Sequence, residues 1–159
     1  MKQLTFTIFG GTGDLTFRKL LPALYNLQAQ HKLEEDFSIV IIGRREYDHD
    51  SYCAEAAGWI KQFARLPYRE DEFAQFAKRI HYVRMDFTRL ENYEALNTFY
   101  KDHNLQHHVF YFAVAPRFFA VIAQGLVQVE KACKGKVIIE KPFGEDLESA
   151  RIRSEERRV

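Results

Sequence analysis

The sequence predicts an α/β domain built on a doubly wound, mostly parallel sheet. Apolar runs typical of buried strands alternate with amphipathic helical patterns five times along the chain. The runs at 37–42 and 109–114 are almost continuously apolar, as strands buried on both faces of a parallel sheet are. The first strand ends in a glycine-rich turn, and a helical pattern begins directly after it. Right-handed crossovers would join such units into one sheet.

The first unit consists of an expected strand at 4–9, a turn at 10–13 and a helix. In the turn, Gly10 and Gly11 can adopt a positive φ, and Gly13 lacks the Cβ that would keep a pyrophosphate away from the backbone. The first N–H groups of the helix then point at the phosphates, with the positive end of the helix dipole behind them. This order is typical of Rossmann-like dinucleotide-binding domains; an ordinary turn is the alternative.

The remaining elements follow in order. Pro22 falls inside the first helical pattern and is expected to kink or split that helix near Leu21. Residues 48–51 offer caps for the next helix, and Thr88 is expected to cap a helix that runs to about residue 102. Pro116 suits the first position of a further helix. The later strands are expected at 37–42, 80–85, 109–114 and 136–140.

Length and composition exclude several classes of function. The 159 residues fit one domain, with 47% hydrophobic and 28% charged residues as in ordinary globular proteins. With 23 basic and 22 acidic residues, no overall field favours nucleic acid or an anionic membrane as a partner. No long apolar run or signal-peptide pattern predicts membrane insertion or secretion. Cys53 and Cys133 fit a reduced, cytoplasmic protein, although a disulfide stays open.

The end of the second expected strand carries two arginines, Arg44 and Arg45. Sites for NAD usually present a carboxylate there, which accepts hydrogen bonds from the ribose hydroxyls. Two guanidinium groups instead favour the 2′-phosphate of NADP, by their charge and their fork geometry. The alternative is a solvated pair that is neutralised by Glu46. Ligands bind at the carboxyl ends of parallel strands, so one crevice is expected to contain the glycine turn, both arginines, Ala115, Pro116 and Lys141.

Four segments together resemble the glucose-6-phosphate dehydrogenase family over roughly residues 4–150. They are Gly10-Gly11-Thr12-Gly13-Asp14-Leu15, Arg18-Lys19-Leu20-Leu21-Pro22, Ala115-Pro116-Arg117-Phe118-Phe119 and Glu140-Lys141-Pro142-Phe143-Gly144. The resemblance implies an NADP-binding Rossmann-like domain over 1–150 of a cytoplasmic oxidoreductase in the pentose phosphate pathway. Such an enzyme oxidises glucose 6-phosphate to 6-phosphogluconolactone, with NADP⁺ as the hydride acceptor.

The resemblance also implies roles for single residues. The phosphate-binding turn of the family is matched by Gly10, Thr12, Gly13, Asp14 and Leu15. Arg44 matches the arginine that binds the 2′-phosphate, and Arg45 stands beside it. The segment near the nicotinamide is matched by Ala115 and Pro116.

Two lysines match substrate-facing positions of the family. Lys141 matches a lysine that lies between cofactor and sugar, and Lys19 matches a second lysine that faces the substrate pocket. The alternatives are a solvent-exposed helix charge for Lys19 and a partner of Glu140 for Lys141.

The proton acceptor of the family has no counterpart in this sequence. Loss of a hydride from C1 of the sugar requires a base for the hydroxyl proton. In the family, a histidine–aspartate pair in a further, larger domain takes this role, so no catalytic residue is expected here. The six histidines fall on expected helix ends, loops or strand starts, and each is expected to have a surface role without a bound metal: His31, His49, His81, His103, His107 and His108.

The last nine residues, 151–159, depart from the family as a charged tail that is expected to be frayed or disordered. An early stop, a frameshifted end or a trimmed chain would explain it, and sheet and helix surface left uncovered would favour self-association. We therefore expect the cofactor-binding portion of the dehydrogenase, without turnover alone. An autonomous NADP-binding regulatory or interaction module is the alternative. A short-chain reductase is disfavoured, because no Tyr-x-x-x-Lys spacing follows the fourth strand.

Overall fold

The computed structural model describes residues 4–129 and 135–139. Its five strands are all parallel and form one sheet in the order β3-β2-β1-β4-β5. They are β1 (Thr5–Phe9), β2 (Ser38–Gly43), β3 (Ile80–Arg84), β4 (His108–Phe112) and β5 (Lys136–Ile139). This arrangement confirms the predicted doubly wound α/β fold. The strand order reverses between β1 and β4, the point at which such sheets bind ligands.

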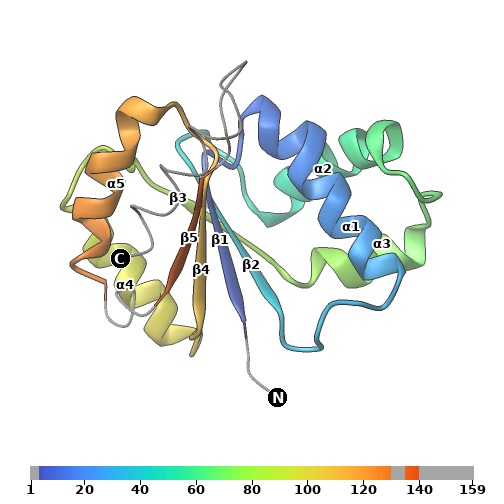
Figure 1. Ribbon diagram of the computed structural model, residues 1–159. Helices are drawn as coiled ribbons and strands as arrows, with labels where there is room; N and C mark the ends of the chain where they lie inside the picture. The colour runs from blue at the N-terminus through green and yellow to red at the C-terminus, as the bar shows by residue number, and fades with distance from the viewer. Residues whose placement is uncertain (1–3, 130–134, 140–159) are drawn as a thin grey trace, which may run out of the picture.

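Helices cover both faces of the sheet and give a three-layered domain (Figure 1). One face carries α1 (Leu21–Ala29), α2 (His49–Phe63) and α3 (Glu70–Ala77). The other face carries α4 (Asn92–Asp102) and α5 (Phe119–Leu126). Neighbouring residues of one strand belong to opposite cores: Ile8 faces α1–α3, whereas Phe9 faces α4 and α5. The central strands are therefore buried on both sides, as their continuous apolar runs predicted.

The helix after β1 is split, as Pro22 predicted. A π turn, η1 (Thr16–Leu20), precedes α1, and the Leu21 N–H donates to the carbonyl of Thr16. Pro22 lies in the first turn of α1. A proline ring clashes with the carbonyl four residues earlier in a regular α-helix, so a wider turn before Pro22 relieves that clash.

Two of the expected helix caps behave differently. Asp48 caps α2, because its carboxylate accepts from the Ser51 N–H at 2.7 Å and the Ser51 hydroxyl accepts from the Asp48 N–H at 2.9 Å. The expectation that Thr88 caps the next helix is wrong. Its N–H and hydroxyl both donate to Asp86, and α4 begins only at Asn92. A local side-chain turn has replaced the cap.

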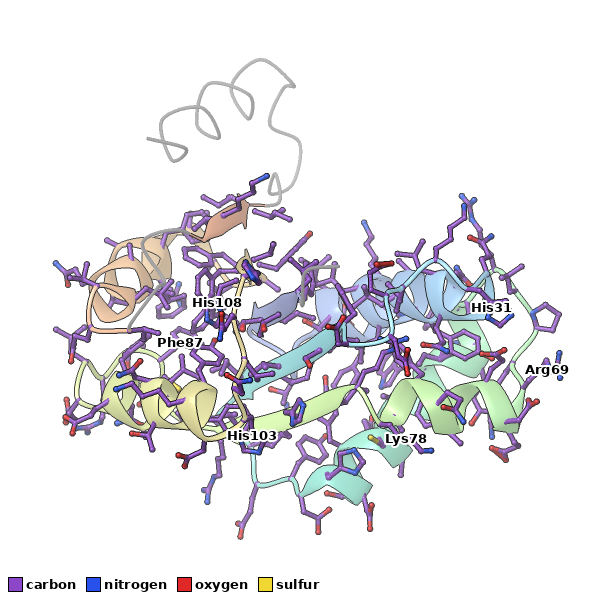
Figure 2. The ribbon with its side chains drawn as sticks, turned by 90° about the horizontal axis from the view of Figure 1, so that it is seen from below. His31, Arg69, Lys78, Phe87, His103 and His108 are labelled. Atoms are coloured by element: carbon purple, nitrogen blue, oxygen red, sulfur yellow. The ribbon has the colours of Figure 1, made fainter. Side chains whose placement is uncertain are left out.

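Two expectations about single residues need correction or refinement. Pro116 opens a 3₁₀ turn, η2 (Pro116–Phe118), which leads into α5. His108 was expected on the surface, but it is buried at the start of β4, with its ring 4.3 Å from that of Tyr100 and 5.3 Å from that of Phe110 (Figure 2). Lys141 and the tail at 151–159 lie outside the described residues. Across the described ranges, no helix is long and apolar enough to span a membrane.

Candidate dinucleotide-binding site

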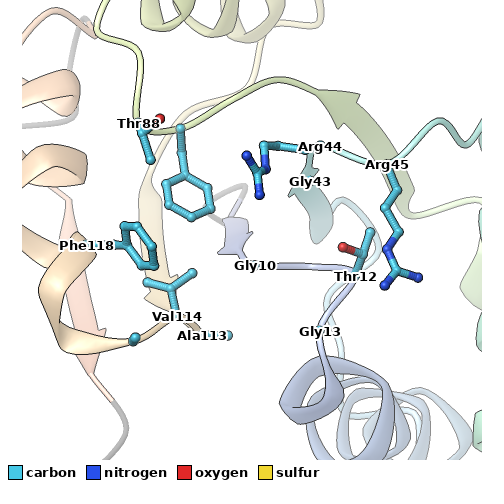
Figure 3. Close-up of a pocket in the computed structure, with 12 residues that line it drawn as sticks. Gly10, Thr12, Gly13, Gly43, Arg44, Arg45, Thr88, Ala113, Val114 and Phe118 are labelled. Carbon is cyan, nitrogen blue, oxygen red and sulfur yellow. The ribbon is translucent and has the colours of Figure 1, made fainter.

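A cleft of about 650 Å³ opens at the carboxyl ends of β1–β4 (Figure 3). Loops from all four strand ends contribute to it, as the rule for parallel sheets predicts. The lining residues are Gly10, Thr12, Gly13, Gly43, Arg44, Arg45, Phe87, Thr88, Ala113, Val114, Ala115 and Phe118. This volume falls within the usual range for small-molecule and cofactor sites.

The glycine turn after β1 is shaped by close contacts. Gly10 adopts a φ of +88°, and a Cβ there would lie 2.4 Å from the carbonyl oxygen of Ala113. Gly11 does not adopt a positive φ, but a Cβ there would lie 2.1 Å from Cγ2 of Ile41. At Gly13 the nearest atom would be the carbonyl oxygen of Gly10, at an ordinary 3.4 Å. The fold therefore requires glycine at the first two positions, while Gly13 leaves open space.

Backbone hydrogen bonds hold the turn in place. The N–H groups of Gly10 and Gly11 both donate to the carbonyl of Ile42 on β2, at 3.2 and 2.9 Å. The Gly13 N–H and the Thr16 hydroxyl both donate to the carbonyl of Gly10, at 3.1 and 3.0 Å. These bonds fix the turn against β2 and against the start of the following helix.

Arg44 and Arg45 form a cationic end of the cleft. Both side chains are exposed; that of Arg44 points into the cleft, and that of Arg45 points toward Thr12 (Figure 3). Within the described part of the chain, neither guanidinium forms an ion pair, so the alternative pairing with Glu46 is not observed. Two cations that form no ion pair among the described residues favour an anionic ligand.

The backbone beneath these arginines is held by three donors. Arg84 Nε donates to the carbonyl of Arg44 at 3.1 Å. The carbonyl of Arg45 accepts from the Tyr82 hydroxyl at 2.6 Å and from the Tyr47 N–H at 3.1 Å. The loop that carries both arginines (the arginine loop, residues 44–47) therefore has a defined backbone, although both arginine side chains are exposed.

The loop after β3 brings a carboxylate to the same end. Hydrogen bonds from Thr88 lower the pKa of Asp86 below its ordinary value of 3.8, and the nearby charges of Arg44 and Arg89 lower it further. Arg89 Nε lies 3.9 Å from Asp86 Oδ2. Asp86 is thus ionised at neutral pH and partly offsets the positive charge of Arg44.

One wall of the cleft is apolar. Phe87 and Phe118 meet edge to face, with ring centroids 5.4 Å apart, and Val114 extends this wall. The Phe87 carbonyl accepts a hydrogen bond of 2.7 Å from the Tyr93 hydroxyl, which anchors the loop. A cleft with cations at one end and aromatic rings on a wall is suited to a ligand with both phosphates and planar rings.

The structure separates the predicted site residues into three groups. Six line the cleft: Gly10, Thr12, Gly13, Arg44, Arg45 and Ala115. Five lie outside its lining: Gly11, Asp14, Leu15, Lys19 and Pro116. Gly11 packs behind the glycine turn, and the Asp14 carboxylate lies 3.1 Å from Arg18 Nε. Leu15 follows the glycine turn, Pro116 follows the loop after β4, and Lys19 is exposed on η1. Lys141 lies outside the described residues.

Sequence reasoning missed six lining residues: Gly43, Phe87, Thr88, Ala113, Val114 and Phe118. For Phe87 and Thr88 the sequence held a usable signal: they follow the expected strand at 80–85, so they should reach the same edge of the sheet as the other loops.

The described residues contain no group of three or more His, Cys, Asp or Glu side chains that could hold a metal ion.

Comparison with known proteins identifies relatives of the chain. The family model "Glucose-6-phosphate dehydrogenase, NAD binding domain" matches residues 7–156. Glucose-6-phosphate 1-dehydrogenase of Rhizobium meliloti (strain 1021) is 32% identical over 152 residues, which cover 94% of this chain and 31% of that protein. The enzyme of Chlamydia pneumoniae is 34% identical over 157 residues, which cover 91% of this chain and 31% of that protein. The chain thus spans under a third of these relatives.

Solved structures agree with this relationship. The crystal structure of glucose-6-phosphate 1-dehydrogenase from Mycobacterium avium matches with a TM-score of 0.78 and 29% identity, over 94% of this chain and 32% of that chain. A glucose-6-phosphate dehydrogenase in complex with its substrate glucose-6-phosphate matches with a TM-score of 0.69 and 24% identity, and this likeness supports the fold alone. With the family model covering most of its length, the chain belongs to the family of NAD-binding domains of glucose-6-phosphate dehydrogenase.

Proposed function

We propose that this chain is the NADP-binding portion of a glucose-6-phosphate dehydrogenase. The observation that carries the proposal is the pair of exposed guanidinium groups, Arg44 and Arg45, which lie beside the glycine turn and form no ion pair with any residue that the structure describes. Where NAD enzymes usually place a carboxylate to hold the ribose hydroxyls, this chain places two cations. A 2′-phosphate is the group that distinguishes NADP from NAD, and it is the natural ligand for these side chains.

The remaining lining residues support a position for each part of the dinucleotide. The pyrophosphate would lie over Gly13, where the backbone is open. Because Gly10, Gly11 and Gly13 use their N–H groups inside the fold, we infer that Thr12, Asp14 and Leu15 supply the phosphate-binding N–H groups at the helix start.

The aromatic wall is suited to a planar base. Phe87 and Phe118 offer ring surface beside the cationic end, so the adenine would stack there. The nicotinamide half would extend toward Ala115 and Pro116 at the end of β4. Lys141, by the family match, would then lie between nicotinamide and sugar, with Lys19 toward the substrate.

In the proposed reaction, the C1 hydrogen of glucose 6-phosphate leaves as a hydride and the C1 hydroxyl loses a proton, which gives 6-phosphogluconolactone. NADP⁺, when bound, supplies the hydride acceptor. This chain's residues bind and orient the two reactants, and the proton acceptor comes from a further domain of the family's enzymes. We therefore expect residues 1–150 to bind NADP⁺ without turnover by themselves, as one part of a cytoplasmic enzyme.

A calorimetric titration of the 159-residue chain with NADP⁺ and with NAD⁺ tests this proposal. Charge-assisted hydrogen bonds contribute about 1.5–3 kcal/mol each, so NADP⁺ should bind at least about tenfold more tightly. Adenosine 2′,5′-bisphosphate should bind nearly as well as NADP⁺, because it carries the 2′-phosphate and the base. Equal affinity for both dinucleotides, or binding of neither, would contradict the proposal. Adding glucose 6-phosphate to the complex should produce no absorbance at the wavelength of NADPH.

A further inference from the structure

Three tyrosines form a cluster beneath the cleft without lining it: Tyr47, Tyr52 and Tyr82. The rings of Tyr52 and Tyr82 stack with centroids 5.2 Å apart. Tyr47 meets both edge to face, at 5.5 and 5.6 Å. These side chains come from the loop after β2, from α2 and from β3, so the cluster packs the loop that carries both arginines against α2 and β3.

Two hydroxyl groups of this cluster reach the two halves of the cleft. The Tyr52 hydroxyl donates to the carbonyl of Gly11 in the glycine turn, at 2.6 Å. The Tyr82 hydroxyl donates to the carbonyl of Arg45, also at 2.6 Å. Burial, followed by the proximity of Tyr82, raises the pKa of Tyr52 well above its ordinary value, so the hydroxyl remains a proton donor. The stacked rings of Tyr52 and Tyr82 therefore connect the glycine turn to the arginine loop.

Gly43 lets these parts approach one another. A Cβ at Gly43 would lie 2.8 Å from Cγ2 of Thr12 and 2.8 Å from the hydroxyl oxygen of Tyr82. The last residue of β2 is therefore closely packed between the glycine turn on one side and the tyrosine cluster on the other. A larger residue there would push the two halves of the cleft apart.

We propose that Tyr52 and Tyr82 are positioning residues that set the spacing between the phosphate-binding turn and the arginine loop, and that Tyr82 thereby contributes to the preference for NADP over NAD. The proposal rests on the proposed function. Arg44 and Arg45 are exposed on a loop, and an unrestrained loop would lose conformational freedom when a phosphate binds. A loop held by the Tyr82 hydroxyl has already lost that freedom.

The two tyrosines should differ in their effect on the ligands. Tyr52 contacts the turn beneath the pyrophosphate, which NADP and NAD share. Tyr82 contacts the arginine loop. The arginine side chains of that loop would bind the 2′-phosphate, which NADP carries and NAD lacks. A purely structural role for both would lower stability on substitution and leave the ratio of the two affinities unchanged.

The test compares Tyr82→Phe and Tyr52→Phe in the 159-residue chain by titration with NADP⁺ and NAD⁺. Because one hydrogen bond is lost, Y82F should weaken NADP⁺ binding about threefold to tenfold and NAD⁺ binding less than about twofold. Y52F should weaken both by a similar factor. Tyr68→Phe is the matched control: its hydroxyl donates to Glu70 at 3.1 Å, outside the cleft lining, and its loss should change neither affinity. An unchanged ratio of affinities in Y82F would overturn the specificity role.

Amide hydrogen exchange without ligand provides a second, independent measurement. In Y82F the amides of the arginine loop, residues 44–47, should exchange faster than in the wild-type chain, while the amides of the five strands should exchange at unchanged rates. Unchanged exchange at 44–47 would overturn the positioning role. If the wild-type chain binds neither dinucleotide, the proposed function fails and the specificity role fails with it, whereas the exchange experiment still decides whether Tyr82 restrains the loop.

Discussion

The glycine turn and the arginine loop face the same cleft, yet the fold builds them in opposite ways. The turn is held by backbone hydrogen bonds and leaves no room for side chains: a Cβ at Gly10 or at Gly11 would collide with Ala113 or with Ile41. The arginine loop carries two exposed arginine side chains on a backbone that hydrogen bonds hold. The sequence of the turn is thus constrained by folding itself. The arginine side chains can change without cost to the core, so cofactor preference can vary on a constant scaffold.

Removing both arginine side chains should have the largest effect on binding. Arg44→Ala/Arg45→Ala should lower NADP⁺ affinity by about 10²–10⁴-fold, since each lost charge-assisted contact contributes about 1.5–3 kcal/mol. NAD⁺ affinity and thermal stability should barely change, because both side chains are exposed. Calorimetry and a thermal melt measure the two quantities.

The matched control for that variant is Arg65→Ala/Arg69→Ala, which removes two exposed arginines outside the cleft lining. It should leave both affinities unchanged. A parallel loss of NADP⁺ affinity in the control would mean that overall charge, and not the arginine loop, attracts the cofactor.

Gly10→Ala should have the largest effect on folding. A Cβ at φ +88° would be strained and would collide with a backbone oxygen, so the free energy of unfolding should fall by about 2–4 kcal/mol in urea titrations. Gly58→Ala is the control: nothing lies within 4 Å of the new Cβ in α2, and the variant should gain about 0.5–1 kcal/mol. Equal stability of the two variants would show that the turn tolerates a side chain.

Gly13→Ala should separate binding from folding within the turn. The nearest atom to its new Cβ is 3.4 Å away, so the free energy of unfolding should change by less than about 1 kcal/mol. The methyl group would occupy the space proposed for the pyrophosphate, and both NADP⁺ and NAD⁺ should bind about tenfold or more weakly. Retained affinity for both would place the pyrophosphate elsewhere in the cleft.

The smallest effect is expected from Asp86→Asn, at the arginine end. Loss of one negative charge near Arg44 should raise NADP⁺ affinity about twofold to threefold and leave NAD⁺ affinity unchanged. Hydrogen bonds from Thr88 are the main cause that lowers the pKa of Asp86 below 3.8, so the carboxylate stays ionised throughout pH 5.5–8 and loses its charge only as the pH falls further. The ratio of affinities between variant and wild type should therefore be constant over pH 5.5–8. A ratio that falls toward 1 at pH 5.5 would contradict this protonation state.

Most of the fold could be predicted from the sequence because local patterns determine it. Continuous apolar runs identified the strands that are buried on both faces, and Pro22 identified the split in the first helix. Gly10, Thr12, Arg44 and Arg45 stood at strand ends, where a parallel sheet brings loops together.

The rest of the site depends on contacts between distant segments. Phe87 and Thr88 reach the cleft because a turn around Asp86 redirects the chain after β3, and the sequence pattern suggested a helix cap there instead. The reason for glycine at position 11 is the side chain of Ile41 on the neighbouring strand, not its own backbone angle. The burial of His108 likewise comes from α4, whose Tyr100 covers it.

The strand order has a consequence for how this domain folds. Central strand β1 pairs with β2 on one side, Thr5 opposite Ser38, and with β4 on the other, Thr5 opposite His108. During synthesis β1 appears first among the described strands, and its second partner appears only after β2, β3 and four helices have been made. Closing that longer loop is the slower step. Until it closes, the nascent chain presents an open strand edge and the uncovered ring of Phe9, which makes this half-built sheet the stage most exposed to misassembly.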